Sequence, residues 1–258
     1  MSETILSVEG VSLNFGGVQA VKAVDVEVTR HHITAIIGPN GAGKTTLFNV
    51  INGLFPPSEG RITFSNGSEI DITNHRTDQI AALGIARTFQ NIRLFSSMTV
   101  LENVKIGFHP RTKTGVLGAI FPLPSSRREE REVNYAALQC LDFVGLATEA
   151  GMQAGSLAYG DRRRLEIARA LASSPTLILF DEPAAGMNPR ETEDLMELIR
   201  KICRAGVTVL LIEHDMRLVM GISDWIYVID HGKNIAEGKP GEIQQNPKVT
   251  EAYLGVQE

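Results

Sequence analysis

Apolar and polar residues alternate near the start of the chain, in three stretches that read ILSVEGVSLNF, AVDVEVT and ITAIIG. A period of two is typical of strands with one face in a core, so we predict three strands here. Farther along, FPPSEGRITFSNGSEIDI indicates short strands with Asn66-Gly67 as a hairpin turn. DWIYVIDHGKNIAEG predicts another pair of strands joined by a turn, followed by a polar tail.

Continuous apolar runs indicate strands of a second kind. TLILFDEP and VTVLLIEHD have the length of a strand and few polar positions, which is typical of strands buried on both faces. They alternate with segments of helical spacing, KTTLFNVINGL and ETEDLMELIRKICRAG. Strands that alternate with helices predict a mainly parallel sheet covered by helices. From about Asn91 to Ser174 the pattern is helical, apart from the loop HPRTKTGVLGAIFPLPSS.

These elements predict an α/β fold in one domain over residues 1–258. Residues 1–90 and 175–258 are expected to form a core with a mainly parallel sheet and an antiparallel β lobe at its N-terminal end. Residues 91–174 are expected to form an inserted helical lobe. The longest apolar runs are as short as strands and cannot span a bilayer. The N-terminus lacks a basic segment followed by an apolar stretch, so we expect no secretion signal.

Composition narrows the classes of partner. The net charge of −5 gives no global electrostatic reason to bind nucleic acid. The hydrophobic content of 43% is ordinary for a soluble globular protein. Cys140 and Cys203 lie far apart in stretches of helical spacing, so we expect apolar packing rather than a disulfide.

A phosphate-binding loop follows the third predicted strand and opens a predicted helix. Gly38–Thr45 reads GPNGAGKT and fits the pattern G-x-x-x-x-G-K-[ST] at every position. Its glycines let backbone N–H groups turn toward phosphate oxygens, Lys44 reaches the β- and γ-phosphates, and the Thr45 hydroxyl suits Mg²⁺. The alternative is a glycine-rich turn that precedes a lysine. The residues expected to contact nucleotide are Asn40, Gly41, Ala42, Gly43, Lys44, Thr45 and Thr46.

Two acidic residues end the buried strand LILFDE. Asp181 is expected to hold Mg²⁺ through water, and Glu182 to orient or deprotonate an attacking water. The alternative is that both are solvated carboxylates at the end of a strand.

The stretch LAYGDRRRLEIARAL raises an electrostatic question. Arg162, Arg163 and Arg164 crowd the start of a predicted helix, where the helix dipole is already positive. This arrangement is unfavourable unless an anion lies opposite the helix end. The alternative is that Arg162 and Arg163 are solvated and Arg164 pairs with a nearby carboxylate.

Taken together, these motifs resemble the ATP-binding subunits of ABC transporters, in the family's order and over nearly the whole chain. The resemblance implies the ABC ATPase fold, a P-loop NTPase (RecA-like) core, and hydrolysis of ATP with Mg²⁺ to drive transport across a membrane. By position, the matches are Phe15 (aromatic residue on adenine), Gly38–Thr46 (Walker A), Gln90 (Q-loop), Leu157–Asp161 (signature), Leu177–Glu182 (Walker B), Asn188 (D-loop) and His214 (switch histidine).

The resemblance also assigns roles. Two subunits of this family pair head to tail, so the anion opposite the arginines would be ATP held by the partner. Glu182 would be the general base and His214 would hold the γ-phosphate and the water in line, together with Lys44 and Gln90 as catalytic groups. Thr45, Gln90 and Asp181 would hold the metal. The signature residues expected to contact the partner's ATP are Leu157, Ala158, Tyr159, Gly160 and Asp161.

Several positions depart from the family pattern. In the signature, Ala158 replaces the usual serine, Tyr159 the first glycine and Asp161 the glutamine. The missing serine hydroxyl removes a hydrogen bond to charged phosphate that is worth roughly 1.5–3 kcal/mol. Asn188 stands where aspartate is common. His31-His32 replaces a common Gly-Glu pair, and the sequence offers no reason for it beyond two surface positions.

The departures, with FDEPAAGMNP, ARTFQNIRLF and the closing NPKVTEAYLG, look like the LivG type of ATPase from importers of branched-chain amino acids. This implies a peripheral place on the cytoplasmic face of the cell membrane. The implied partners are a second ATPase of the LivF type or a second copy of this chain, two membrane permeases and, indirectly, a periplasmic binding protein. Importers of other amino acids, amides or urea remain alternatives. An ABC ATPase acting on nucleic acid or ribosomes is a remote one, because such chains usually carry two cassettes or a long coiled coil.

Two segments could contact the membrane partners. Leu94 and Phe95 could line a groove for a permease helix, or be ordinary core residues. The insertion at 109–126, with its apolar TGVLGAIFPLP, is expected to cap the helical lobe, with permease or lipid headgroups as the alternative.

Overall fold

The computed structural model of this protein describes residues 3–108 and 124–254. The chain divides into two compact units. Residues 1–87 and 176–258 form the first, which we call the core unit, and residues 88–175 form the second, the helical unit.

The first sheet of the core unit is antiparallel, with strand order β2-β1-β4-β5. The hairpin predicted at Asn66-Gly67 is confirmed, since Ser65 pairs with Glu69 and Gly67 has a φ of 86°. The four strands are β1 (Thr4–Phe15), β2 (Val18–Thr29), β4 (Glu59–Ser65) and β5 (Glu69–Asp71).

The second sheet has the order β10-β9-β3-β8-β7-β6, and all its pairs are parallel except β10 with β9. Every residue of β3, β7 and β8 is buried, as the continuous apolar runs predict. Its strands are β3 (Ile33–Ile37), β6 (Ile85–Arg87), β7 (Leu177–Asp181), β8 (Thr208–Ile212), β9 (Trp225–Asp230) and β10 (Lys233–Gly238). The mainly parallel sheet and the closing pair of strands are therefore confirmed.

Strand β6 is the element that the sequence pattern misses. It has only three residues, IAR, and lies at the edge of the sheet, where it pairs with β7 alone. Three residues are too few to show an alternation of apolar and polar positions. The helices α2 (Thr77–Ala82) and α8 (Met216–Ile222) are missed because they too are short, with six and seven residues.

The prediction of a polar tail after β10 is wrong as far as residue 254. This segment forms two short helices, α9 (Pro240–Gln244) and α10 (Pro247–Leu254). Each begins with a proline, which suits the first turn of a helix. Ile243 and Val249 are buried. Partial burial raises the pKa of the Tyr253 hydroxyl and the nearby backbone of Gly38 lowers it, so this end of the chain reaches the phosphate loop.

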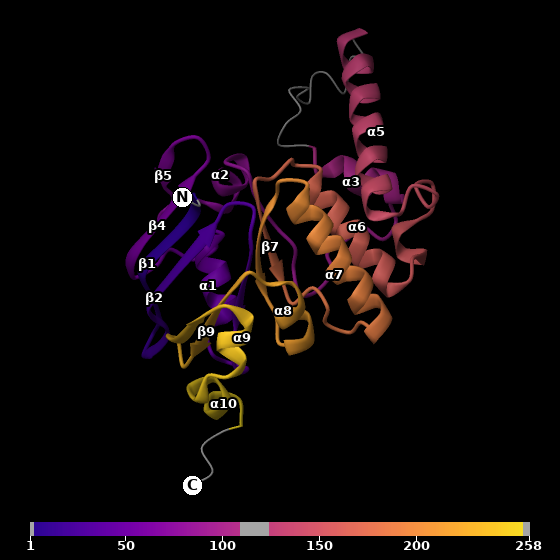
Figure 1. Ribbon diagram of the computed structural model, residues 1–258. Helices are drawn as coiled ribbons and strands as arrows, with labels where there is room; N and C mark the ends of the chain where they lie inside the picture. Colours follow the sequence, from indigo (N-terminus) through magenta and orange to yellow (C-terminus); the bar gives the residue numbers. More distant parts are fainter. Residues whose placement is uncertain (1–2, 109–123, 255–258) are drawn as a thin grey trace. The chain divides into compact units, whose positions relative to one another are not determined.

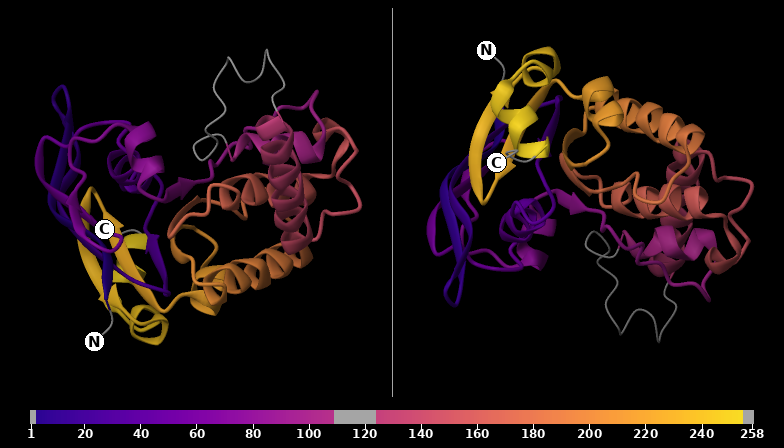
Figure 2. Two further views of the ribbon diagram at one scale, coloured as in Figure 1. Left: turned by 90° about the horizontal axis from the view of Figure 1, so that it is seen from above. Right: turned by 90° about the horizontal axis from the view of Figure 1, so that it is seen from below.

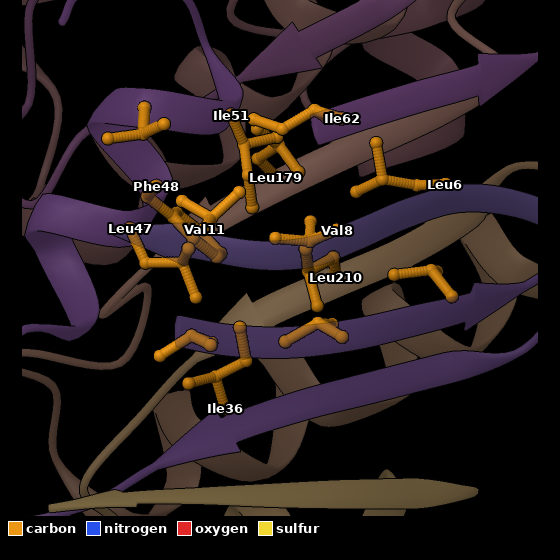
Figure 3. Packing of buried hydrophobic residues seen from close by; sticks show 14 of the residues in the cluster. Leu6, Val8, Val11, Ile36, Leu47, Phe48, Ile51, Ile62, Leu179 and Leu210 are labelled. Atoms are coloured by element: carbon orange, nitrogen blue, oxygen red, sulfur yellow. The ribbon is translucent and has the colours of Figure 1, made fainter. Parts of the chain in front are cut away.

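One hydrophobic cluster joins both sheets of the core unit to α1 (Lys44–Ile51). Figure 3 shows side chains of β1, α1 and the parallel strands in contact, and Figure 2 shows the antiparallel strands beside β9 and β10. Because α1 is held by this cluster, the loop that opens it has a fixed position. The labelled members are Leu6, Val8, Val11, Ile36, Leu47, Phe48, Ile51, Ile62, Leu179 and Leu210.

The turn between β2 and β3 explains part of the His31-His32 pair. His31 is exposed and has a φ of 60°, a conformation that glycine adopts readily, which suits the glycine common in the family that the sequence resembles. His32 is only half-buried rather than a fully exposed surface residue. Cys203 is half-buried too, and its Sγ donates to the His31 carbonyl at 3.2 Å.

The helical unit consists of α3 (Val100–Ile106), α5 (Pro124–Val144), the 3₁₀ turn η2 (Ala154–Ser156) and α6 (Tyr159–Leu171). The three α-helices pack against one another (Figure 1). Phe95 is 52% exposed, so it is not an ordinary core residue. The insertion at 109–126 lies outside the described residues as far as 123. In the parts of the chain that the structure describes, no helix combines the length and apolarity that crossing a bilayer requires.

Asn188 is the N-cap residue of α7 (Pro189–Arg204), and asparagine is sufficient for this capping role. Its Oδ1 accepts hydrogen bonds from the N–H groups of Arg190 and Glu191, both at 3.0 Å, and Glu191 Oε2 accepts from the Asn188 N–H. Asparagine and aspartate are equally good at this capping position.

We therefore expect Asn188→Asp to leave stability nearly unchanged and Asn188→Ala to lower the free energy of unfolding by about 1 kcal/mol. For a chain of this size that is a fall of roughly 2–4 °C in melting temperature. Thermal unfolding of the two variants beside the wild type measures the difference. Equal melting temperatures for all three chains would contradict a stabilising cap.

Candidate functional site

The loop between β3 and α1 is shaped by glycines that no other residue could replace. Gly38 has a φ of 149°, and a Cβ there would lie 1.9 Å from the Ile229 carbonyl oxygen. Gly43 has a φ of 99°, and its Cβ would lie 2.4 Å from the Ala20 carbonyl oxygen. The backbone therefore turns tightly against its neighbours, as a loop that closes on phosphate oxygens must.

This loop lines a cavity of about 440 Å³, within the usual range for small-molecule sites. The cavity brings together Asn40–Thr46 and Glu182, which the sequence assigns to the nucleotide. The sequence does not predict the remaining lining residues, because they come from β2 and from the turn between β9 and β10. They are Val18, Gln19, Ala20, Lys22, His231 and Gly232.

Backbone hydrogen bonds connect these wall segments to the loop. The Gly232 N–H donates to the Ala42 carbonyl at 2.9 Å, and the Lys22 N–H donates to the Gly232 carbonyl at 2.7 Å. No side-chain motif encodes these contacts, so no pattern in the sequence could have revealed the wall. Phe15, the expected adenine contact, is 46% exposed at the end of β1 and packs edge-to-face on Phe55, with ring centroids 5.3 Å apart.

Lys44 is buried in the loop. Its Nζ donates to the carbonyls of Gly38 at 2.7 Å and Pro39 at 2.8 Å. Burial lowers the pKa of this amine, while the nearby carboxylates of Glu182 and Asp181 raise it. The amine is thus placed at the base of the cradle with acidic groups close to it.

Asp181 ends β7 as half of a buried ion pair. Its Oδ2 accepts from Arg87 at 2.7 Å, and the two side chains are 4% and 5% exposed. The other terminal nitrogen of the Arg87 guanidinium donates to Asn49 Oδ1 on α1 at 2.8 Å. Arg87 therefore links the helix of the phosphate loop to the strand that carries Asp181.

The second oxygen of Asp181 fits the expected metal. Oδ1 is buried and has no hydrogen-bond partner among the residues that the structure describes. A buried acceptor without a donor is unfavourable, and a hydrated cation would satisfy it. A carboxylate and the Thr45 hydroxyl are oxygen ligands of the kind that Mg²⁺ prefers.

Glu182 follows with a strained backbone, at a φ of 46°. Its N–H donates to the Ile212 carbonyl of β8 at 2.9 Å, and its Oε2 lies 3.7 Å from Nδ1 of His214. The structure thus brings Glu182 and His214 together at the carboxyl ends of neighbouring strands, which is where ligand sites form in open parallel sheets.

Glu213 is a buried acidic residue beside the site that the sequence patterns do not reveal. Its side chain is fully buried, and burial raises the pKa of its carboxyl group. Oε1 accepts from the Ala184 N–H at 2.8 Å, and Oε2 accepts from the His214 N–H at 3.0 Å. It therefore connects the segment just after Glu182 to the segment that carries His214. An acidic residue directly after the apolar run of β8, in LLIEHD, is the signal that could have revealed it.

Gln90 and the signature segment belong to the helical unit. Ala158 occupies the N-cap of α6 and makes no side-chain cap, which is the consequence of the missing serine. Tyr159, Gly160 and Asp161 form the first turn of the helix, and Tyr159 is exposed.

The three arginines have three different environments. Arg162 bends back and donates to the carbonyls of Gly155 at 2.7 Å and Leu157 at 2.9 Å. Arg164 lies 3.9 Å from Asp161, as the alternative interpretation predicts. Solvation of Arg163 is wrong, because its side chain is completely buried.

Comparison with known proteins adds independent findings. A family model described as ABC transporter matches residues 21–185, and one described as branched-chain amino acid ATP-binding cassette transporter matches residues 233–258. The chain is 47% identical over 256 residues to the high-affinity branched-chain amino acid transport ATP-binding protein LivG of Salmonella typhimurium, and the alignment covers 99% of both chains. It is 48% identical to the corresponding protein BraF of Pseudomonas aeruginosa, again over 99% of each chain.

Solved structures agree with these matches. The ADP conformation of MJ1267, an ATP-binding cassette of an ABC transporter, superposes with a TM-score of 0.85 at 35% identity, covering 98% of this chain and 100% of that one. The dimeric structure of MJ0796, a bacterial ABC transporter cassette, gives a TM-score of 0.76 at 26% identity, covering 92% and 99%.

Proposed function

The chain belongs to the ABC transporter family, as one of its ATP-binding proteins, and from this premise we propose that it powers the import of branched-chain amino acids through partner permeases. ABC ATPases of this kind bind and hydrolyse ATP to drive transport. The proposal concerns the residues that do so in this chain, the partners and the cargo.

One observation carries the proposal: the cavity that contains Lys44 and the phosphate loop also contains Glu182. ATP held by the loop therefore has its terminal phosphate near a carboxylate that can take a proton from water. Glu182 acts as general base, and His214, 3.7 Å away, orients the water and the γ-phosphate. Phe15 stacks on adenine, which is worth about 0.5–1.5 kcal/mol beyond burial.

Mg²⁺, when bound, would neutralise charge on the phosphates during hydrolysis. Thr45 would hold it with its hydroxyl and Asp181 through water, while Arg87 fixes the other oxygen of Asp181. The family pattern adds Gln90 as a further residue that would hold the metal.

The partners follow from the family. MJ0796 forms a dimer, and we propose a head-to-tail pair here too, with a LivF-type ATPase or with a second copy of this chain. The α6 terminus at Leu157, Ala158, Tyr159, Gly160 and Asp161 then faces the partner's ATP with its positive helix end. The assembly also includes two permeases and, indirectly, a periplasmic binding protein. In it, this chain lies peripherally on the cytoplasmic face of the membrane.

Uptake by the reconstituted transporter tests the cargo. Vesicles that contain this chain, its partner ATPase, the two permeases and the binding protein are given ATP and radiolabelled leucine. We expect ATP-dependent accumulation of leucine, isoleucine and valine, with glutamine and urea as controls. Accumulation of an amide or urea without leucine would contradict the proposed cargo, while leaving the ATPase assignment in place.

A further inference from the structure

Arg163 is the largest completely buried side chain among the residues that the structure describes, and it is charged. Its guanidinium group makes three short hydrogen bonds within the helical unit. Nη1 donates to the Phe89 carbonyl at 2.7 Å and to Glu166 Oε2 at 2.7 Å, and Nη2 donates to the Gln90 carbonyl at 2.9 Å. Two of the three acceptors therefore belong to the backbone at and just before Gln90.

Glu166 holds the same peptide from its other side. Its Oε1 accepts from the Phe89 N–H at 3.3 Å, and its side chain is 2% exposed. Burial raises the pKa of this carboxyl group and Arg163 lowers it, so the pair compensates part of its own desolvation. Arg163 and Glu166 lie three residues apart on α6 and together bind the N–H and C=O of Phe89 and the C=O of Gln90.

Such a pair is not needed for packing alone. Two buried charges lose their hydration, and apolar residues of similar volume would fill the space at equal or lower cost. What the charges provide is directional: a planar fork that fits two carbonyls, and a carboxylate that fits an amide. The arrangement fixes a segment of backbone to the helix, which apolar contacts do only loosely.

We propose that Arg163 and Glu166 are positioning residues that fix the backbone of Gln90 to α6, the helix that begins at the signature segment. The position of Gln90 then depends on α6, and a movement of that helix is passed to Gln90 by hydrogen bonds rather than through the intervening loops. The catalytic consequence rests on the role proposed above for Gln90, whereas the attachment itself does not.

The attachment is tested by amide exchange in the double variant Arg163→Met with Glu166→Leu. Changing both partners avoids leaving one buried charge unpaired, so the chain is expected to fold. We expect the Phe89 amide to exchange about 10-fold faster or more, as loss of a hydrogen bond to a charged group implies. The Phe95 amide, which donates to Asn103 Oδ1 at 3.0 Å in the same unit, is the internal control and should keep its rate. Unchanged exchange at Phe89 would overturn the proposal.

The catalytic consequence is tested by a double-mutant cycle with Gln90→Ala in the assembled transporter. The paired change at Arg163 and Glu166 should lower kcat about 10-fold in the chain that keeps Gln90. It should lower kcat much less in the chain that already carries Gln90→Ala, because both changes remove the same action. Equal losses in the two backgrounds would show a merely structural role and overturn the proposal. Arg163→Lys, which keeps the charge and part of the donor set, should recover a share of the loss.

Three single variants keep the causes separate. Arg128→Met makes the same chemical change at a side chain that is 84% exposed on α5, and it should alter neither exchange nor turnover. A Gln90→Ala chain with normal turnover would refute the catalytic role of Gln90, and the exchange rate of Phe89 would then decide the attachment by itself. Loss of turnover in Glu182→Gln tests the proposed ATPase mechanism independently of both.

Discussion

Changing Glu182 to glutamine is expected to lower ATP turnover by about 10²- to 10⁴-fold, the usual loss when a positioned general base is removed. The amide keeps the size of the side chain but cannot accept the proton of the attacking water. Lys44, the phosphate loop and the cavity wall are unchanged, so ATP binding should survive. Because hydrolysis is what separates the proposed head-to-tail pair, the variant should also accumulate as an ATP-bound dimer.

Three measurements check this result: phosphate release, equilibrium binding of a fluorescent ATP analogue, and size-exclusion chromatography with ATP and with ADP. Glu69→Gln on the exposed strand β5 makes the same chemical change far from the cavity residues in sequence and should behave as the wild type. Turnover at the wild-type rate in Glu182→Gln would refute the assignment of the base. Loss of ATP binding would show instead that Glu182 contributes to the binding of ATP before hydrolysis.

The sequence predicts those parts of the site that lie in one continuous segment. Gly38–Thr46 and Asp181-Glu182 are recognisable because a strand end, a loop and a helix start follow one another along the chain. The strands β3, β7 and β8 are recognisable for a related reason, since burial on both faces requires an unbroken apolar run.

The remaining parts depend on contacts between distant segments. The turn at His231-Gly232 joins the cavity through backbone hydrogen bonds that any residue type could make. Glu213 and Arg163 are charged residues in buried positions, and composition alone counts them as surface charges. Among the three adjacent arginines, Arg163 neither faces an anion opposite the helix end nor is solvated, because its guanidinium group donates to the backbone of Phe89 and Gln90.

Arg87 is another residue whose contacts the sequence does not reveal, and its substitution has the largest expected effect on stability. It lies in β6, the strand that the pattern misses, and its partners Asn49 and Asp181 are distant in sequence. Arg87→Met should lower the free energy of unfolding by about 3–5 kcal/mol, because it leaves the Asp181 carboxylate buried without its counter-charge. The hydrogen bond to Asn49 and the contact of the guanidinium with the Phe48 ring, at 5.8 Å, are lost as well.

Urea unfolding of Arg87→Met measures this loss, and a second change identifies its cause. Asp181→Asn, added to Arg87→Met, removes the buried charge and should recover much of the stability while abolishing turnover, since Asp181 is also the proposed metal ligand. Arg61→Met is the control, because it breaks an exposed ion pair with Asp71 whose contact distance is 2.8 Å. It should leave the unfolding midpoint unchanged. If Arg87→Met unfolds at the wild-type midpoint, then Asp181 does not need its partner, and the assignment of Oδ1 to the metal, which relies on Arg87 holding Oδ2, has no basis. If the double variant instead stays as unstable as the single one, the strand β6 requires Arg87 for its packing rather than for its charge.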